Sequence, residues 1–166
     1  MLNENEKENY YETMKILVSA CLLGENCKYS GGNNYNQAVC DFARGHQVVP
    51  VCPEVLGGLP TPRCPAEIVQ GVVTNKEGIN VDREFRAGAA KALAIAKENE
   101  VELAILQSRS PSCGVKEIYD GTFSGTKIPG QGVFAKMLMD EGIRVLDAGE
   151  LPKIILKNED GKCQSN

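Results

Sequence analysis

The chain has 166 residues, of which 42% are hydrophobic and 24% charged, as is ordinary for one soluble globular domain with a substantial core. Its net charge of -4 argues against a general binder of DNA or other polyanions, although it leaves room for a local basic pocket. No apolar run approaches the ~20 residues of a membrane span, and the polar start MLNENEKENYYETM is unlike a signal peptide, so we expect a cytoplasmic protein without membrane contact.

Strands and helices are predicted to alternate between two polar ends. Residues 1–13 and 152–166 are expected to be tails, and residues 14–151 a single domain. The predicted elements, in chain order, are strand 15–21, helix 35–45, strand 46–52, helix 82–100, strand 102–108, helix 131–142 and strand 143–147. Asp82 is the expected cap of the helix that begins there. The order of strands and helices predicts an α/β fold. A mostly parallel sheet carries helices on both faces, in a Rossmann-like three-layer arrangement.

Two long segments, 53–81 and 109–130, are rich in Gly and Pro and are predicted to be loops. Loops of this length in a compact domain are usually functional. The first begins directly after a predicted strand, with Cys52, Pro53 and Glu54 in succession. We expect Pro53 to prevent an immediate helix and to hold Glu54 close to the end of the strand.

The chain has seven cysteines, and in a reducing compartment cysteines are used for metal binding or catalysis more often than for disulfides. It has no C-x-x-C pair and only one histidine, so the usual signals of a redox pair or a zinc ribbon are missing. Three cysteines lie at or just beyond the carboxyl ends of predicted strands, where open parallel sheets bind ligands: Cys21, Cys52 and Cys113. Buried packing is the alternative for each one alone, but the three together favour a site.

The other four cysteines carry weaker signals. Cys40 falls within a predicted helix and is expected to be core, and Cys163 lies in a predicted tail. Cys64 and Cys27 lie in loops near the expected site. We expect no function for Cys64, whereas Cys27 could be a fourth ligand, a reactive thiol or neither.

Three thiolates without histidine suit zinc or an iron–sulfur cluster, and their spacing does not decide between the two. A [4Fe–4S] cluster held by only three cysteines leaves one iron open. An open iron is a Lewis acid for which sulfur is the preferred soft partner.

Three motifs, SACLLGENCKYSGG, PVCPEVLGGLPTPR and SRSPSCG, together resemble the thiouracil desulfidase (TudS) family, formerly a domain of unknown function. The resemblance runs from about Met14 to Leu151. Many relatives have the motif C-R-Y-D-G where this chain has Cys27-Lys28-Tyr29-Ser30-Gly31. Lys28 therefore replaces the Arg of that motif, and Ser30 replaces its Asp. Gln107 also replaces a common Lys, so the substrate contacts can differ from those of relatives.

The resemblance implies a [4Fe–4S] cluster bound by Cys21, Cys52 and Cys113, with catalytic functions for Glu54 and Ser110. It implies the removal of sulfur from a small thiolated uracil compound, thiouracil or 4-thiouridine monophosphate, to give the oxo-base and sulfide without redox chemistry. In this mechanism Glu54 activates water, and Ser110 relays a proton or orients the ring. Without the resemblance, Glu54 would be interpreted as a solvent-facing or capping carboxylate.

Three further residues are candidate substrate contacts: Arg63, Lys28 and Ser112. Arg63 either meets a substrate phosphate or forms a surface salt bridge, and turn chemistry alone would also explain the serines around Pro111. Two other functions stay open: a zinc- or cluster-binding protein without turnover, and a cluster-based sulfur carrier for nucleotide or RNA thiolation. No feature of the sequence specifies an oligomeric state.

Overall fold

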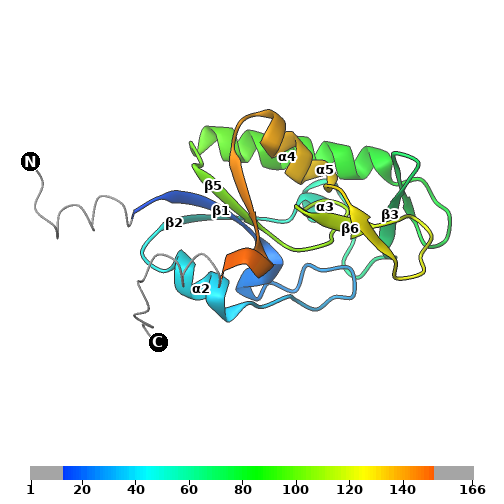
Figure 1. The fold of residues 1–166 in the computed structure, drawn as a ribbon, viewed down its shortest axis with the longest axis horizontal. Coiled ribbons are helices and arrows are strands. Elements are labelled where there is room, and N and C mark those ends of the chain that lie inside the picture. Colours follow the sequence, from blue (N-terminus) through cyan, green and yellow to red (C-terminus); the bar gives the residue numbers. More distant parts are fainter. Residues whose placement is uncertain (1–12, 152–166) are drawn as a thin grey trace, which may run out of the picture.

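A four-stranded parallel sheet forms the centre of the computed structural model, which describes residues 13–151 (Figure 1). Its strands lie in the order β2-β1-β5-β8. Their bounds are β1 Lys15–Ser19, β2 Gln47–Val51, β5 Leu103–Leu106 and β8 Arg144–Asp147. All three pairings are parallel, so the strands end at one edge of the sheet. The predicted parallel α/β sheet is therefore confirmed.

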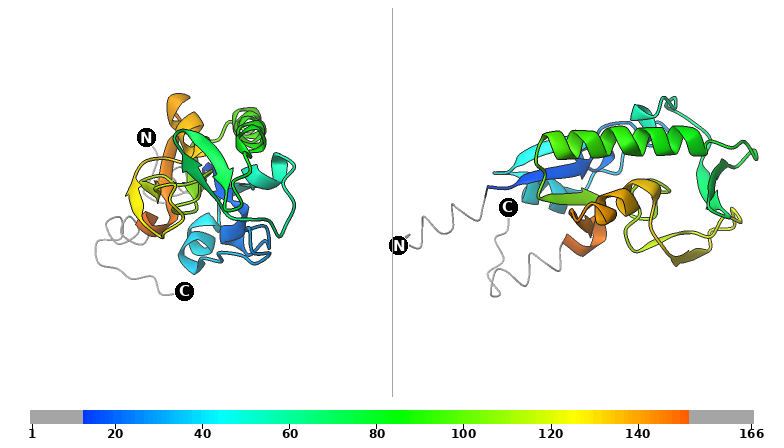
Figure 2. Two further views of the ribbon diagram at one scale, coloured as in Figure 1. Left: turned by 90° about the vertical axis from the view of Figure 1, so that its right-hand side faces the viewer. Right: turned by 90° about the horizontal axis from the view of Figure 1, so that it is seen from above.

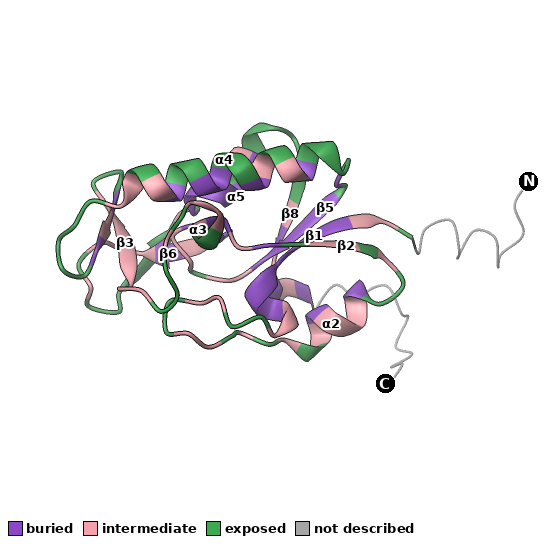
Figure 3. Cartoon of the chain, turned by 180° about the vertical axis from the view of Figure 1, so that it is seen from behind, coloured by how far each residue is buried: buried purple, intermediate pink, exposed green. Residues whose placement is uncertain are grey.

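Helices cover both faces of this sheet. Seen end-on, the sheet lies between α4 (Asp82–Glu98) and α2 (Gln37–Ala43), and α5 (Val133–Asp140) packs beside α4 (Figure 2). Alternate residues of β1 point to opposite faces, as the two-residue period of a strand requires. Leu17 packs in the core under α4 and α5, whereas Ile16 and Val18 pack in the core that includes α2. The buried residues accordingly run through the strands and along the inner side of α4 (Figure 3).

The predicted elements exist, but their ends are shorter than expected. The first strand stops at Ser19, and a 3₁₀ turn, η1 (Ala20–Leu23), carries Cys21 instead. Asp82 does not cap α4: Val81 is the cap, and Asp82 is the first helical residue. The Asp82 carboxylate accepts a hydrogen bond from the Val73 amide at 3.0 Å, which ties the helix to a neighbouring hairpin. The two predicted tails and Cys163 lie outside the described residues.

The two segments predicted as loops contain regular structure. The first holds the short helix α3 (Pro53–Leu56) and the hairpin β3 (Ala66–Val69) and β4 (Val72–Asn75), and the second holds the hairpin β6 (Glu117–Tyr119) and β7 (Lys127–Pro129). The expectation that Pro53 prevents a helix is wrong, because Pro53 is the first residue of α3. Proline suits this position because its fixed φ is helical and its missing N–H would have no partner there.

Helix α3 lies in backbone contact with α4 through two glycines. A β-carbon at Gly88 of α4 would overlap the carbonyl oxygen of Pro53, and one at Gly57 would overlap the carbonyl oxygen of Glu84. Only glycine allows two helices to approach this closely. The long helix therefore sets the position of α3, and with it the positions of Cys52 and Glu54 at the sheet edge.

Helix α5 holds the segment after β5 in a similar way. No side chain caps α5. Its first amides donate instead to backbone carbonyls of that segment: Val133 to Pro111 at 2.8 Å, and both Phe134 and Ala135 to Ser112 at 2.9 and 3.1 Å. These bonds satisfy amides that a helix start leaves unpaired. Within the described residues, no helix is long and apolar enough to cross a bilayer.

The contact of α3 with α4 predicts that Gly88→Ala destabilises the fold. At an unobstructed helical site this change would raise the free energy of unfolding by about 1 kcal/mol. Here the added methyl group must displace backbone, so we expect a decrease of about 2 kcal/mol, measured by urea denaturation. Ala87→Gly on the exposed side of α4 is the control and should lose only about 1 kcal/mol. Unchanged or increased stability of Gly88→Ala would contradict the close contact.

Candidate active site

A cavity of ≈ 770 Å³ opens at the carboxyl edge of the sheet. The segments after β1, β2 and β5 form its wall, as expected for an open parallel sheet. Most residues singled out in the sequence line it: Cys21, Cys27, Lys28, Cys52, Glu54, Arg63, Ser110 and Cys113. The structure therefore brings together residues from three distant segments of the chain.

Three different backbone settings position the predicted cysteine ligands. Cys21 lies in η1, Cys52 is the residue that precedes α3, and Cys113 lies in the segment held by the start of α5. Cys21 and Cys113 are buried and Cys52 is half-buried. Among the described residues, no group of three or more His, Cys, Asp or Glu side chains converges on a point that could hold a single metal ion. All three thiols line the same cavity.

Cys27 lies in the same group of thiols as the predicted ligands. Hydrogen bonding to the Cys27 thiol lowers the pKa of Cys21 and lowers the pKa of Cys52 to about 7, because a thiol hydrogen that either sulfur can accept stabilises its thiolate. The same interaction, with Cys21 first and Cys52 second, raises the pKa of Cys27 itself because it favours the protonated thiol. Burial raises the pKa of Cys113. Cys27 therefore lies between two predicted ligands.

Cys40 and Cys64 lie outside the wall of the cavity. The Cys40 thiol donates to the carbonyl oxygen of Leu22 at 3.7 Å, within the packing of α2 against η1. One polar neighbour of the thiols was not expected from the sequence: the side-chain amide of Asn34 donates to the Cys21 sulfur at 3.5 Å. Its sequence signal is the asparagine-rich stretch 33–36.

The Glu54 carboxylate is bound at both oxygens. Its Oε1 accepts from Nε of Arg63 at 3.1 Å, and its Oε2 accepts from Oγ of Ser112 at 3.2 Å. The Glu54 side chain is 16% exposed and that of Arg63 is 6% exposed. The structure therefore contains a salt bridge between Arg63 and Glu54 that is part-buried rather than at the surface.

Arg63 also binds the backbone on either side of the cavity. Its Nη2 donates to the carbonyl oxygen of Cys27 at 2.8 Å. Its Nη1 donates to the carbonyl oxygen of Pro60 at 3.2 Å and to Oγ1 of Thr61 at 3.0 Å. A guanidinium presents five donors in a fixed plane, which suits several simultaneous acceptors. Arg63 thus joins the loop of Glu54 to the loop of Cys27.

Of the remaining predicted residues, Ser110 and Lys28 line the cavity, whereas Ser112 binds a residue that lines it. Ser110 lines the cavity, and its Oγ accepts from the amides of Ser112 and Cys113, both at 3.0 Å. Lys28 also lines the cavity, with its ammonium 5.6 Å from the centre of the Tyr29 ring. Ser112, expected to contact substrate, is fully buried and supports Glu54 instead.

Comparison with known proteins adds three findings. The family model for 2-thiouracil desulfurase matches residues 16–150. The uncharacterized protein YbbK of Bacillus subtilis is 42% identical over 150 residues, which are 84% of this chain and 99% of YbbK. A solved structure of the [4Fe-4S]-dependent thiouracil desulfidase TudS superposes with a TM-score of 0.79 at 39% identity, covering 88% of this chain and 98% of that one.

The buried ion pair predicts that Arg63→Met destabilises the protein strongly. The change leaves Glu54 with an uncompensated charge, so we expect the free energy of unfolding to fall by about 3 kcal/mol. Arg86→Met is the matched control, because Arg86 pairs with Asp82 at 2.7 Å but is 50% exposed. That pair should contribute no more than about 0.5 kcal/mol. Equal losses in the two variants, measured by urea denaturation, would contradict a structural function of the Arg63 pair.

Proposed function

The chain belongs to the 2-thiouracil desulfurase family, and we propose that it removes sulfur from a thiolated uracil, either thiouracil or 4-thiouridine monophosphate. Water replaces the sulfur, so the products are the oxo-base and sulfide, and no electrons are transferred. One observation carries the proposal: Cys21, Cys52 and Cys113 line a single cavity together with Glu54.

We propose a [4Fe–4S] cluster as the cofactor, since the structural relative depends on one. The residues fit it: the cavity offers thiols, the ligands that such clusters take. Cys21, Cys52 and Cys113 would hold it. When bound, a cluster with one iron free of cysteine would supply a Lewis acid that polarises the thiocarbonyl group.

Glu54 is the proposed general base. Its carboxylate lies on the wall of the same cavity as the three thiols. It would take a proton from the water that attacks the carbon bearing the sulfur. Arg63 and Ser112 each bind one of its oxygens, so the carboxylate has one orientation before substrate enters. Such preorganisation is what a positioned base requires.

Ser110 is the proposed proton donor or ring contact. Its oxygen already accepts two backbone amides, which fixes the oxygen and leaves the hydroxyl hydrogen as a donor. From the cavity wall this hydrogen can bond to a nitrogen or oxygen of the pyrimidine ring. Lys28 lies on the same wall and offers a second, charged contact to the substrate.

Removing a proposed ligand should remove the cluster. We expect Cys21→Ala, Cys52→Ala and Cys113→Ala to abolish the visible absorption of the anaerobically reconstituted protein, because a cube held by two cysteines is labile. Cys40→Ala is the control: its thiol packs elsewhere, so iron and sulfide contents should equal those of the wild type. Loss of the cluster in Cys27→Ala, with retention in one of the three named variants, would show that the ligand set is wrong.

Glu54→Gln should separate binding of the cluster from its use. The amide keeps the size of the side chain but cannot accept the proton, so kcat should fall by ~10²–10⁴-fold with little change in KM. Sulfide release from 4-thiouridine monophosphate by the cluster-loaded protein measures this directly. Ser110→Ala should have a smaller effect, because a hydroxyl that orients the ring contributes less than the base. Undiminished turnover by cluster-loaded Glu54→Gln would exclude Glu54 as the base.

A further inference from the structure

Polar side chains lie next to two of the three proposed cluster ligands. The side-chain amide of Asn34 donates to the Cys21 sulfur at 3.5 Å. Burial raises the pKa of the Cys113 thiol, and a hydrogen bond to the Ser19 hydroxyl opposes this increase. Asn34 and Ser19 both line the active-site cavity. Each of them therefore lies beside one proposed ligand, and the two come from separate segments of the chain.

The backbone fixes Asn34 against the turn that carries Cys21. The main-chain amide of Asn34 donates to the carbonyl oxygen of Cys21 at 3.0 Å, and the next amide but one, that of Asn36, donates to the carbonyl oxygen of Leu22 at 3.0 Å. Asn36 also caps α2, because its side chain accepts from the Val39 amide at 3.1 Å. Asn34 is thus held between η1 and the start of α2. Because its main chain and its side chain bind the same residue, the side-chain donor is directed at the sulfur before a cluster enters.

Ser19 is the last residue of β1 and is only 3% exposed. Its oxygen accepts from the backbone amide of Gln107, the residue that follows β5, at 3.0 Å. A hydroxyl that accepts one N–H group keeps its own hydrogen as a donor. The bond between Ser19 and Cys113 favours the thiolate, which a donated hydrogen does. The ends of β1 and β5 therefore orient the Ser19 hydroxyl toward the Cys113 sulfur.

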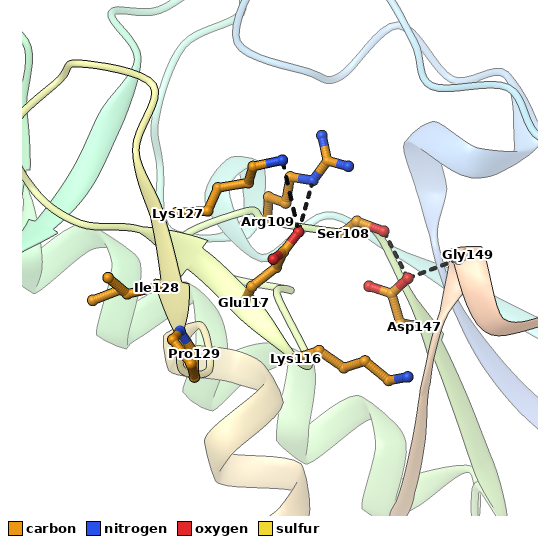
Figure 4. Close-up of a pocket in the computed structure, with 9 residues that line it drawn as sticks. All are labelled: Ser108, Arg109, Lys116, Glu117, Lys127, Ile128, Pro129, Asp147 and Gly149. Atoms are coloured by element: carbon orange, nitrogen blue, oxygen red, sulfur yellow. Dashed lines mark hydrogen bonds and ion pairs between the residues drawn. The ribbon is translucent and has the colours of Figure 1, made fainter.

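Both arginines that line the active-site cavity pair with carboxylates. Arg63 lies 3.1 Å from Glu54. Nε of Arg109 lies 3.3 Å from Oε1 of Glu117, in an adjoining cavity (Figure 4). The donors to the two sulfurs are instead a neutral amide and a neutral hydroxyl. Such donors draw electron density from a sulfur without placing a full positive charge beside it, so they act through the ligand itself.

We propose that Asn34 and Ser19 are positioning residues that donate hydrogen bonds to the cluster-bound sulfurs of Cys21 and Cys113 and so raise the reduction potential of the cluster. This inference rests on the proposed function, which places the cluster on these cysteines. A hydrogen bond draws electron density from a ligand sulfur, so less reaches the iron and reduction becomes easier. Lower electron density also makes iron a stronger Lewis acid, which is the property that the desulfidase proposal requires.

The reduction potential of the anaerobically reconstituted protein tests this inference, measured by dithionite titration with electron paramagnetic resonance. Asn34→Leu keeps the approximate shape of the side chain but cannot donate. We therefore expect a lower potential and, in resonance Raman spectra, a higher iron–cysteine stretching frequency. Asn34→Asp places a carboxylate beside the Cys21 sulfur, so its potential should be lower still.

Ser19→Ala should lower the potential independently. The change removes the donor to Cys113 and leaves the donor to Cys21 in place. Because the two donors act on different ligands, the shifts of Asn34→Leu and Ser19→Ala should add in the double variant. A double variant whose potential is no lower than that of Asn34→Leu would exclude Ser19 from this function.

Asn33→Leu is the matched control. The side chain of Asn33 donates to Asn26 at 2.9 Å and accepts from the Tyr35 amide at 3.0 Å, so it bonds no sulfur. The potential of this variant should equal that of the wild type. A purely structural function of Asn34 would reduce the amount of bound cluster without shifting the potential of the cluster that remains. An unchanged potential in Asn34→Leu, or an equal shift in Asn33→Leu, would overturn the inference.

Turnover separates this inference from the proposed function. In cluster-loaded proteins, kcat for sulfide release should follow the potentials, with the wild type highest, Asn34→Leu several-fold lower and Asn34→Asp lowest. If the wild type releases no sulfide, the desulfidase proposal fails, and the order of the potentials still decides the function of Asn34. If the wild type releases sulfide and Asn34→Leu has the same potential, this inference fails and the desulfidase proposal stands.

Discussion

The carboxylate of Glu54 is the interaction on which the candidate active site depends. One of its oxygens binds Arg63, which also binds the backbone of Cys27, and the other binds Ser112, the neighbour of Cys113. Glu54 itself follows Cys52 by two residues. A single half-buried acid therefore links all three segments that carry the thiols. A group with both oxygens bound is held rigidly, which favours a positioned base over a mobile one.

Rigidity at this edge of the sheet comes from backbone contacts rather than from large side chains. Gly88 lets α4 touch the carbonyl of Pro53. Gly132 plays the same part on the other side, since a β-carbon there would overlap the backbone of Ser112. Because neither contact has a side chain between its two partners, neither can relax by rotamer changes. The two helices thus set the width of the cavity that the proposed cluster would occupy.

The sheet and the placement of Cys21, Cys52 and Cys113 could be predicted from the sequence. The hydrophobic pattern along the chain marks the strands, and the parallel topology brings the carboxyl ends of those strands to one edge of the sheet. The pairing of Arg63 with Glu54 was not predictable, since it depends on how an irregular loop folds back on itself. Helix α3 was missed because the Gly and Pro after it obscured the fact that proline is favourable at a helix start.

The start of α5 has a consequence for how the chain can vary in length. Its first amides donate hydrogen bonds to the carbonyl oxygens of Pro111 and Ser112. The segment that carries Cys113 therefore also caps a helix. Adding or deleting a residue there would both move the thiol and leave those amides unpaired inside the protein. The length of the segment from Ser110 to Cys113 is therefore governed by the helix that follows it.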